Sequence, residues 1–157
     1  MTHELSQHQD ALPPLYEQDY YCWLEQTALL LRQRAFSQIN LENLIEEIED
    51  MGRSEKRAME SNLRVVLVHL LKWKYQPQQR CGSWRGSIAE HRIRISKALH
   101  ESPSLKNYLL EVFAETYRDA IVVASQETEL ESSVFPPACE WTVEQTLDES
   151  WLPDEAD

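Results

Sequence analysis

Arg64 and His69 are separated by four residues in the segment RVVLVH, and together they could act on a phosphodiester. A histidine has an unperturbed pKa of about 6.5, so it can move a proton near neutral pH. It could take the proton of a ribose 2′-hydroxyl while the guanidinium stabilises the charge that builds on the phosphate. If both residues lie on one helix, the turn of about 500° between them leaves the side chains about 140° apart. The pair is therefore a candidate ribonuclease site, although helix geometry does not favour it.

The same R-x4-H spacing is similar to the pair in HEPN ribonucleases, helical-bundle enzymes that usually act as dimers. Those enzymes usually have a polar residue after the arginine, whereas Val65 follows it here. The resemblance implies metal-independent cleavage of RNA through His69 and Arg64. RNA binding or RNA cleavage is therefore the alternative interpretation of this chain.

The following segment, residues 69–87, gathers aromatic and basic side chains within an acidic chain. Proteins that bind single strands combine such aromatic platforms with cations. Trp73 and Trp84 also fall on the apolar stripes of two expected helices, which favours a structural clamp between helices. The candidate binding residues are Lys72, Trp73, Lys74, Arg80, Trp84, Arg85 and His91.

A third candidate is the acidic segment EEIED, in which Glu46, Glu49 and Asp50 could offer oxygens to Mg²⁺ from adjacent helix faces. It is similar to the EExxE motif of helical nucleotide pyrophosphohydrolases, but residues 53–130 lack the second Glu-x-x-Asp pair of those enzymes. No histidine follows a glutamate by three residues, as carboxylate-bridged metal bundles require. We expect a solvated acidic helix start and neither metal nor cofactor. We expect His69 and His91 to hydrogen-bond within the bundle or to pair with these carboxylates, which would raise their pKa.

The charge of the chain is unevenly distributed. Its 157 residues carry a net charge of −12, yet residues 53–106 hold twelve of the 15 basic residues and four acidic ones, a local balance of +8. This segment either binds an anion or compensates acidic helices of the same fold. The three cysteines form no CxxC motif, and neither a signal sequence nor an apolar run of about 20 residues occurs. We expect a cytoplasmic protein with no membrane segment.

The elements that position these candidates are helices. Apolar residues recur at helical spacing over residues 15–34, 41–73, 84–99 and 105–121, and Thr142 with Gln145 predicts the capping box of a short last helix. We expect Asn40 and Ser83 to cap the second and third helices. The pattern predicts an all-α helical bundle of about four main helices plus a short C-terminal helix, with a second helix long enough to kink at Gly52. The expected organisation is a flexible segment over 1–14, a single helical domain over 15–152 and an acidic tail over 153–157.

Several stretches, in order, resemble one bacterial family known only as domain of unknown function family 29: LYEQDYYCWLEQTALLLRQRAF, NLENLIEEIEDMGRSEK, HLLKWKYQP, SWRGSI, SPSL and FPPAC. The resemblance extends from about Leu15 to Pro153. It implies a small all-helical protein and brings no activity, cofactor or catalytic residue. From these patterns we expect an interaction or accessory module without catalytic activity, whose partner is another protein or a second copy bound through the long second helix.

Overall fold

The computed structural model describes residues 14–153, and the chain divides into two compact units, Met1–Met51 and Gly52–Asp157. Residues 1–13 and 154–157 lie outside the described part, and with them most of the segment expected to be flexible and most of the acidic tail. The single domain expected over 15–152 stays a prediction.

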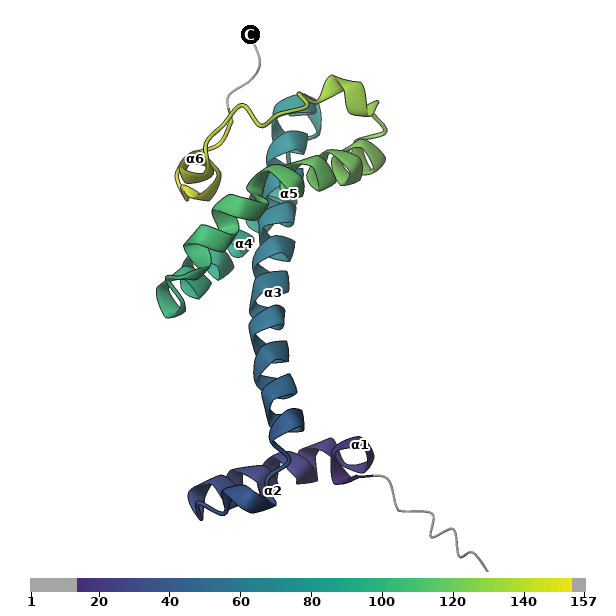
Figure 1. Ribbon diagram of the computed structural model, residues 1–157. Helices are drawn as coiled ribbons and strands as arrows, with labels where there is room; N and C mark the ends of the chain where they lie inside the picture. The colour runs from purple at the N-terminus through teal and green to yellow at the C-terminus, as the bar shows by residue number, and fades with distance from the viewer. Residues whose placement is uncertain (1–13, 154–157) are drawn as a thin grey trace, which may run out of the picture. The chain divides into compact units, whose positions relative to one another are not determined.

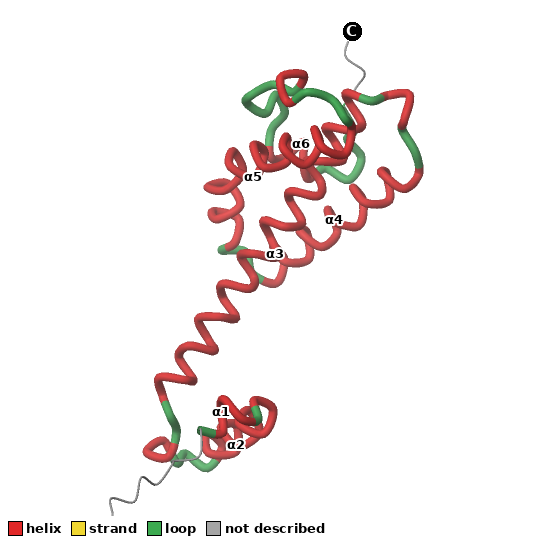
Figure 2. The backbone as a smooth tube through the Cα atoms, turned by 90° about the vertical axis from the view of Figure 1, so that its right-hand side faces the viewer, coloured by secondary structure: helices red, strands yellow, loops and turns green. Residues whose placement is uncertain are grey.

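All regular structure in the described residues is helical, which confirms the all-α fold class (Figures 1 and 2). Short 3-10 helices occupy Phe36–Gln38, Pro77–Gln79 and Ser132–Val134. The α-helices are α1 (Leu15–Gln18), α2 (Tyr20–Arg32), α3 (Leu41–Tyr75), α4 (Gly82–Glu101), α5 (Leu105–Thr128) and α6 (Val143–Leu147). The long second helix of the sequence prediction is α3, which stays helical through Gly52. A kink at that residue stays a prediction.

Local side-chain chemistry explains where several helices begin. The Asp19 carboxylate accepts from the Cys22 amide at 3.0 Å and separates α1 from α2, where the sequence predicted one helix. The predicted cap at Asn40 and the predicted capping box of α6 are confirmed. The predicted cap at Ser83 is wrong, because α4 begins at Gly82 after Cys81, whose side chain caps no amide.

Within the unit Met1–Met51, one carboxylate organises three aromatic rings. The hydroxyls of Tyr16 and Tyr20 each donate to Glu47 at 2.5 Å. The ring of Trp23 packs against both tyrosines, with centroids 4.8 Å and 5.9 Å away. Donation to the Glu47 carboxylate raises the pKa of Tyr16 to about 12. Trp23, Thr27 and Ile39 are its buried described residues, so the core of this unit is small.

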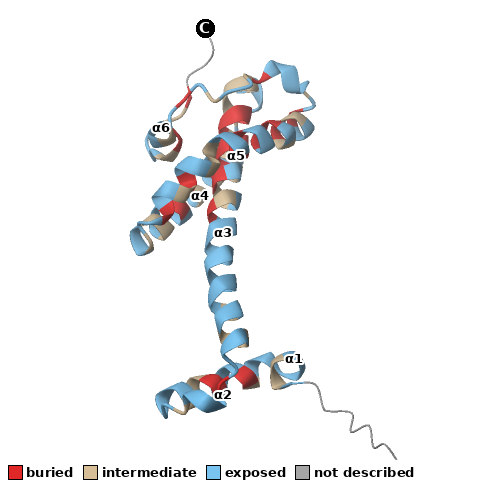
Figure 3. Ribbon diagram, viewed as in Figure 1, coloured by how far each residue is buried: buried red, intermediate tan, exposed pale blue. Residues whose placement is uncertain are grey.

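The unit Gly52–Asp157 has its core where α4 and α5 cover α3 (Figure 3). The apolar stripe of α3 supplies side chains that are at most 1% exposed, including Met59, Leu63, Val66 and Leu70. These positions follow the three- and four-residue steps of one helix face, so a single stripe meets both covering helices. Ile88 and Ile95 from α4 and Leu109, Tyr117 and Ala124 from α5 complete the buried cluster.

The C-terminal segment is held by Arg92, which is only 2% exposed. Its guanidinium donates to the carbonyl oxygens of Thr146 at 2.8 Å, Trp151 at 2.9 Å and Gln145 at 3.5 Å. Carbonyls at the end of a helix carry partial negative charge, which suits a cation. Burial lowers the pKa of Arg92, and the charges of Asp148 and Glu149 oppose that effect. The guanidinium thus connects α4 to α6 and to the segment after it.

Replacing Arg92 by methionine should lower the free energy of unfolding by about 3 kcal/mol, because buried carbonyls would lose charged donors. Arg94→Met is the matched control. Arg94 is exposed on the same helix and pairs with Glu90 at 2.5 Å, so its loss should change stability by less than about 0.5 kcal/mol. Urea unfolding followed by circular dichroism measures both variants. Equal effects would show that Arg92 does not anchor the C-terminal segment.

Candidate functional site

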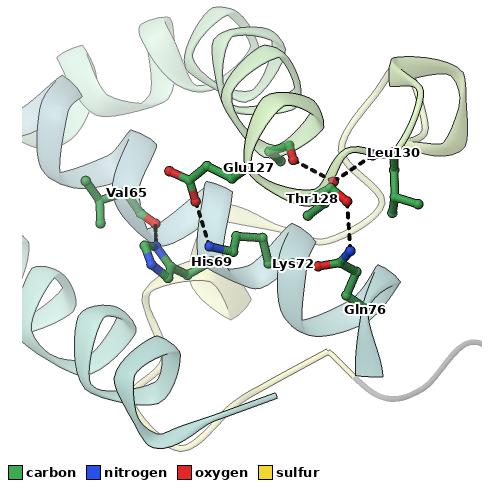
Figure 4. A network of polar contacts seen from close by, with 8 residues as sticks. Val65, His69, Lys72, Gln76, Glu127, Thr128 and Leu130 are labelled. Carbon is green, nitrogen blue, oxygen red and sulfur yellow. Dashed lines mark hydrogen bonds and ion pairs between the residues drawn. The ribbon is translucent and has the colours of Figure 1, made fainter. Parts of the chain in front are cut away.

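The basic candidate residues of the segment 69–87 are Lys72, Lys74, Arg80 and Arg85, and the part of the structure that they occupy is called the basic corner below. Lys72 is 8% exposed, and its ammonium lies 2.6 Å from Glu127 (Figure 4). The same ammonium lies 4.6 Å from the centroid of the Trp84 ring. Lys74 lies 2.9 Å from Glu140 and contacts the Trp141 ring. The hydrogen bond with Glu140 raises the pKa of Lys74. Each of these two lysines is thus paired with a carboxylate within the fold.

A hydrogen bond between neighbouring polar groups joins the end of α3 to the end of α5. Gln76 donates to the Thr128 carbonyl at 2.9 Å, and the Thr128 hydroxyl donates to the Ala124 carbonyl at 2.7 Å (Figure 4). Glu129, which follows, ends α5 with a φ of 58°, in the left-handed region. The bond from Gln76 satisfies a carbonyl that the end of α5 would otherwise leave without a helical donor. It therefore joins the end of α3 to the end of α5.

The two arginines of the corner line an open cavity of about 280 Å³ together with Trp73, Cys81 and Gly82. The guanidinium carbon of Arg80 lies 4.9 Å from the Trp73 ring centroid, and that of Arg85 lies 5.5 Å from it. Arg80 also donates from Nε to the Trp73 carbonyl at 2.8 Å. Among the residues that the structure describes, no carboxylate lines this cavity.

His69 and His91 have defined tautomers. Nδ1 of His69 lies 2.9 Å from the Val65 carbonyl, which can only accept, so Nδ1 carries the proton of the neutral ring (Figure 4). Nδ1 of His91 lies 2.7 Å from Oδ1 of Asn62, whose Nδ2 donates to the Ala58 carbonyl. Both rings therefore keep their Nε2 lone pair. The expected hydrogen bonds within the bundle are confirmed.

The electrostatic surroundings of His91 differ from the expected carboxylate pairing. Burial lowers the pKa of His91, and the positive charge of Arg94 lowers it further, whereas Glu90 opposes both effects. The alternative of a raised pKa is therefore wrong for His91. Among the described residues, no hydrogen bond or ion pair joins the exposed Arg64 to His69. The ribonuclease assignment of this pair stays a prediction.

The three candidate magnesium ligands, Glu46, Glu49 and Asp50, are exposed on α3. Within residues 14–153, no group of three or more His, Cys, Asp or Glu side chains has an arrangement that could hold a metal ion. The neighbouring Glu47 is taken up by the two tyrosine hydroxyls. The three carboxylates therefore gain no geometric support as metal ligands, and the expectation of a solvated acidic helix start stays a prediction.

A separate surface feature is the exposed apolar character of the unit Met1–Met51. Ten of the fourteen exposed large apolar side chains of the described residues belong to this unit. They are Tyr20, Tyr21, Leu24, Leu29, Leu31, Phe36, Leu41, Ile45, Ile48 and Met51. A concentration of this kind marks an interaction surface more often than scattered apolar residues do.

The sequence matches the family model described as "Domain of unknown function DUF29" over residues 15–152. The chain belongs to this family. The match confirms the resemblance seen in the ordered motifs. No curated protein and no solved structure shows significant similarity to the chain. No helix within residues 14–153 is long and apolar enough to cross a membrane.

The sequence analysis did not identify the carboxylates that form ion pairs with the two lysines. Glu127 and Glu140 lie 55 and 66 residues from the lysines they meet, so no local pattern pairs them. Asn62, the partner of His91, lies on a different helix, 29 residues away. Arg92 did leave a signal, because it stands four residues after Ile88 and three before Ile95, within the buried stripe of α4.

We predict that His91 titrates below its ordinary value of about 6.5 in the folded protein. As pH falls through about 6.5, the unfolded chain then binds this proton first, so protonation lowers the free energy of unfolding. His91→Gln should make stability flatter between about pH 7 and about pH 5.5. Nuclear magnetic resonance titration of the ring and urea unfolding at both pH values measure these effects.

His100→Gln is the control, because His100 is exposed at the end of the same helix. The free energy of unfolding of His100→Gln should depend on pH in the same way as that of the wild-type protein. A His91 pKa at or above about 6.5 would contradict the prediction.

Proposed function

We propose that the chain is a protein-interaction module and that its partner is a second copy of itself, bound through α3. The observation that carries this proposal is that the apolar stripe of that helix is exposed over its first turns and buried farther along. Leu41, Ile45 and Ile48 are 53–60% exposed, although they lie on the helix face that continues into the buried Met59 and Leu63. Burying each such side chain contributes about 1.5–3 kcal/mol.

The charges along α3 favour a second copy as the occupant of this stripe. Residues 42–50 contain five acidic residues and no basic one, whereas residues 53–64 contain four basic residues and two acidic ones. An antiparallel pair of α3 helices brings the acidic segment of one copy to the basic segment of the other, and a parallel pair would place acid against acid. The self-complementary pattern therefore supports an antiparallel dimer.

Gly52 lies on the same helix face, four residues after Ile48. A Cβ atom added there would meet nothing within 4 Å, so packing within the described chain does not require a glycine. Its presence costs about 1 kcal/mol relative to alanine in a helix interior. A close crossing of two α3 helices at this position would explain why a residue without a side chain stands there. The three cysteines are free thiols, which supports the cytoplasm as the place where the module works.

The chain, 18.4 kDa as a monomer, should therefore show twice that mass by light scattering after size exclusion. Ile48→Asn should shift the protein to the monomer mass, because it places an amide in the apolar contact. Ile93→Asn is the matched control, since Ile93 is 56% exposed on α4, outside the stripe, and it should remain dimeric. A wild-type protein that is monomeric at micromolar concentrations would contradict the proposal. A monomer in which other residues of the same chain cover the stripe would contradict it equally.

A charge exchange tests whether the contact is made by α3 against α3. One variant carries Glu42→Lys and Glu46→Lys, and the other carries Arg53→Glu and Arg57→Glu. Each alone should be monomeric, because like charges then meet, whereas an equimolar mixture should form a dimer. The wild-type dimer should weaken with added salt. Dimerisation of either variant alone would place the interface elsewhere.

A further inference from the structure

The unit Met1–Met51 contains a cavity of about 200 Å³ whose lining differs in charge from the surface around it. Its lining residues come from α1, α2, the 3-10 helix Phe36–Gln38 and the start of α3. None of the described residues that line it is charged, although residues 14–51 carry eight acidic side chains and two basic ones. An uncharged lining in such a charged segment suits an uncharged ligand.

Thr27 supplies the observation that points to a ligand. It lies on α2, lines the cavity and is 7% exposed. Among the described residues its hydroxyl has no hydrogen-bond partner, whereas the hydroxyl of the equally buried Thr128 donates to the Ala124 carbonyl at 2.7 Å. Buried hydroxyls are nearly always paired, because one without a partner costs free energy. The Thr27 hydroxyl is therefore available to a molecule in the cavity.

Three side-chain amides add donors and acceptors to the same lining. They belong to Gln26, Gln38 and Asn43. Apart from a contact of 3.9 Å between Gln26 Nε2 and Cys22 Sγ, these amides form no hydrogen bond within the described chain. The Asn40 side chain accepts from the backbone amide of Asn43 at 3.1 Å, which fixes the turn that carries Asn43. Each amide thus offers a donor beside an acceptor to a ligand.

Apolar groups form the rest of the lining. Leu15, Leu30 and the buried Ile39 contribute aliphatic side chains, and Trp23 contributes an aromatic ring. A ligand with flat apolar faces could pack against these groups while its edge bonds to the amides. A sugar carries hydroxyl groups around its whole ring, and apolar walls would leave some of them without partners.

We propose that this cavity binds an uncharged nucleobase. A base has two apolar faces and an edge of adjacent donors and acceptors, and an amide side chain can bond to two atoms of such an edge. The volume of about 200 Å³ is below the range of about 300–1,000 Å³ that is typical for drug-sized ligands, so it suits a base more than a whole nucleotide. The site is separate from the proposed dimer contact, because none of its lining residues belongs to the exposed stripe of α3.

The test follows the amide and indole resonances of the ¹⁵N-labelled chain during titration with adenosine, uridine, ribose and AMP. At least one nucleoside should shift the Trp23 indole and the backbone amides of residues 26–30 and 38–43, and ribose should not. AMP should bind more weakly than adenosine at low salt, because its phosphate meets the net negative charge of residues 14–51. A preference for one nucleoside would support the site and identify the base.

Thr27→Val removes the hydroxyl at nearly constant side-chain shape. It should weaken nucleoside binding about threefold to tenfold, the loss expected for one neutral hydrogen bond. It should not lower the melting temperature, because no hydrogen bond within the described chain is lost. Thr128→Val is the matched control, since it removes a buried hydroxyl that has a partner. It should lower the melting temperature and leave binding unchanged.

A second variant, Gln38→Met, keeps the length of the side chain without its amide and should also weaken binding. Equal nucleoside affinity of wild type, Thr27→Val and Gln38→Met would overturn the proposal. So would shifts produced by ribose but by neither nucleoside, since the cavity would then bind a sugar. If neither nucleoside shifts these resonances at millimolar concentration, the cavity holds only solvent or another part of the chain, and the proposal is wrong.

Discussion

The apolar stripe of α3 is the constraint on which the rest of the structure depends. Over residues 59–70 it is buried by α4 and α5, and its side chains are at most 1% exposed at Met59, Leu63, Val66 and Leu70. Apolar burial is the main stabilising contribution available to a chain of this size, so the covering helices are required. The first three turns of α3 carry the same periodicity without the same cover. One sequence pattern therefore produces a core in one segment and an exposed apolar stripe in another.

The C-terminal segment depends on a polar interaction. Arg92 occupies a position of the buried stripe of α4, yet its guanidinium finds three carbonyls instead of a carboxylate. The planar fork of arginine can reach several acceptors at once, which offsets the desolvation that lowers its pKa. Thr146, whose carbonyl is one acceptor, is fully buried. Directional bonds of this kind fix α6 in one arrangement, whereas apolar contact alone would allow several.

The fold could be predicted from the sequence because helical periodicity and caps are local. The stripe of α3, the Asn40 cap and the Thr142–Gln145 capping box each involve residues a few positions apart. The candidate site could be predicted only as a set of residue types. Whether a cation is neutralised depends on acids more than 50 residues away, such as Glu127 for Lys72. The predicted start of α4 is wrong for a local reason. Ser83 has the right chemistry for a cap, but it is the second residue of the helix, after Gly82.

The lysines and arginines of the basic corner have different partners because an ammonium and a guanidinium differ in how strongly water hydrates them. An ammonium is a compact and strongly hydrated charge, so Lys72 can be 8% exposed only with Glu127 at 2.6 Å and the Trp84 ring beneath it. A guanidinium is more weakly hydrated and packs its face on an indole without losing the donors at its edge. The guanidinium of Arg85 packs on Trp73 in this way. The lysines of the segment are thus paired with carboxylates, whereas both of its arginines lie against an indole.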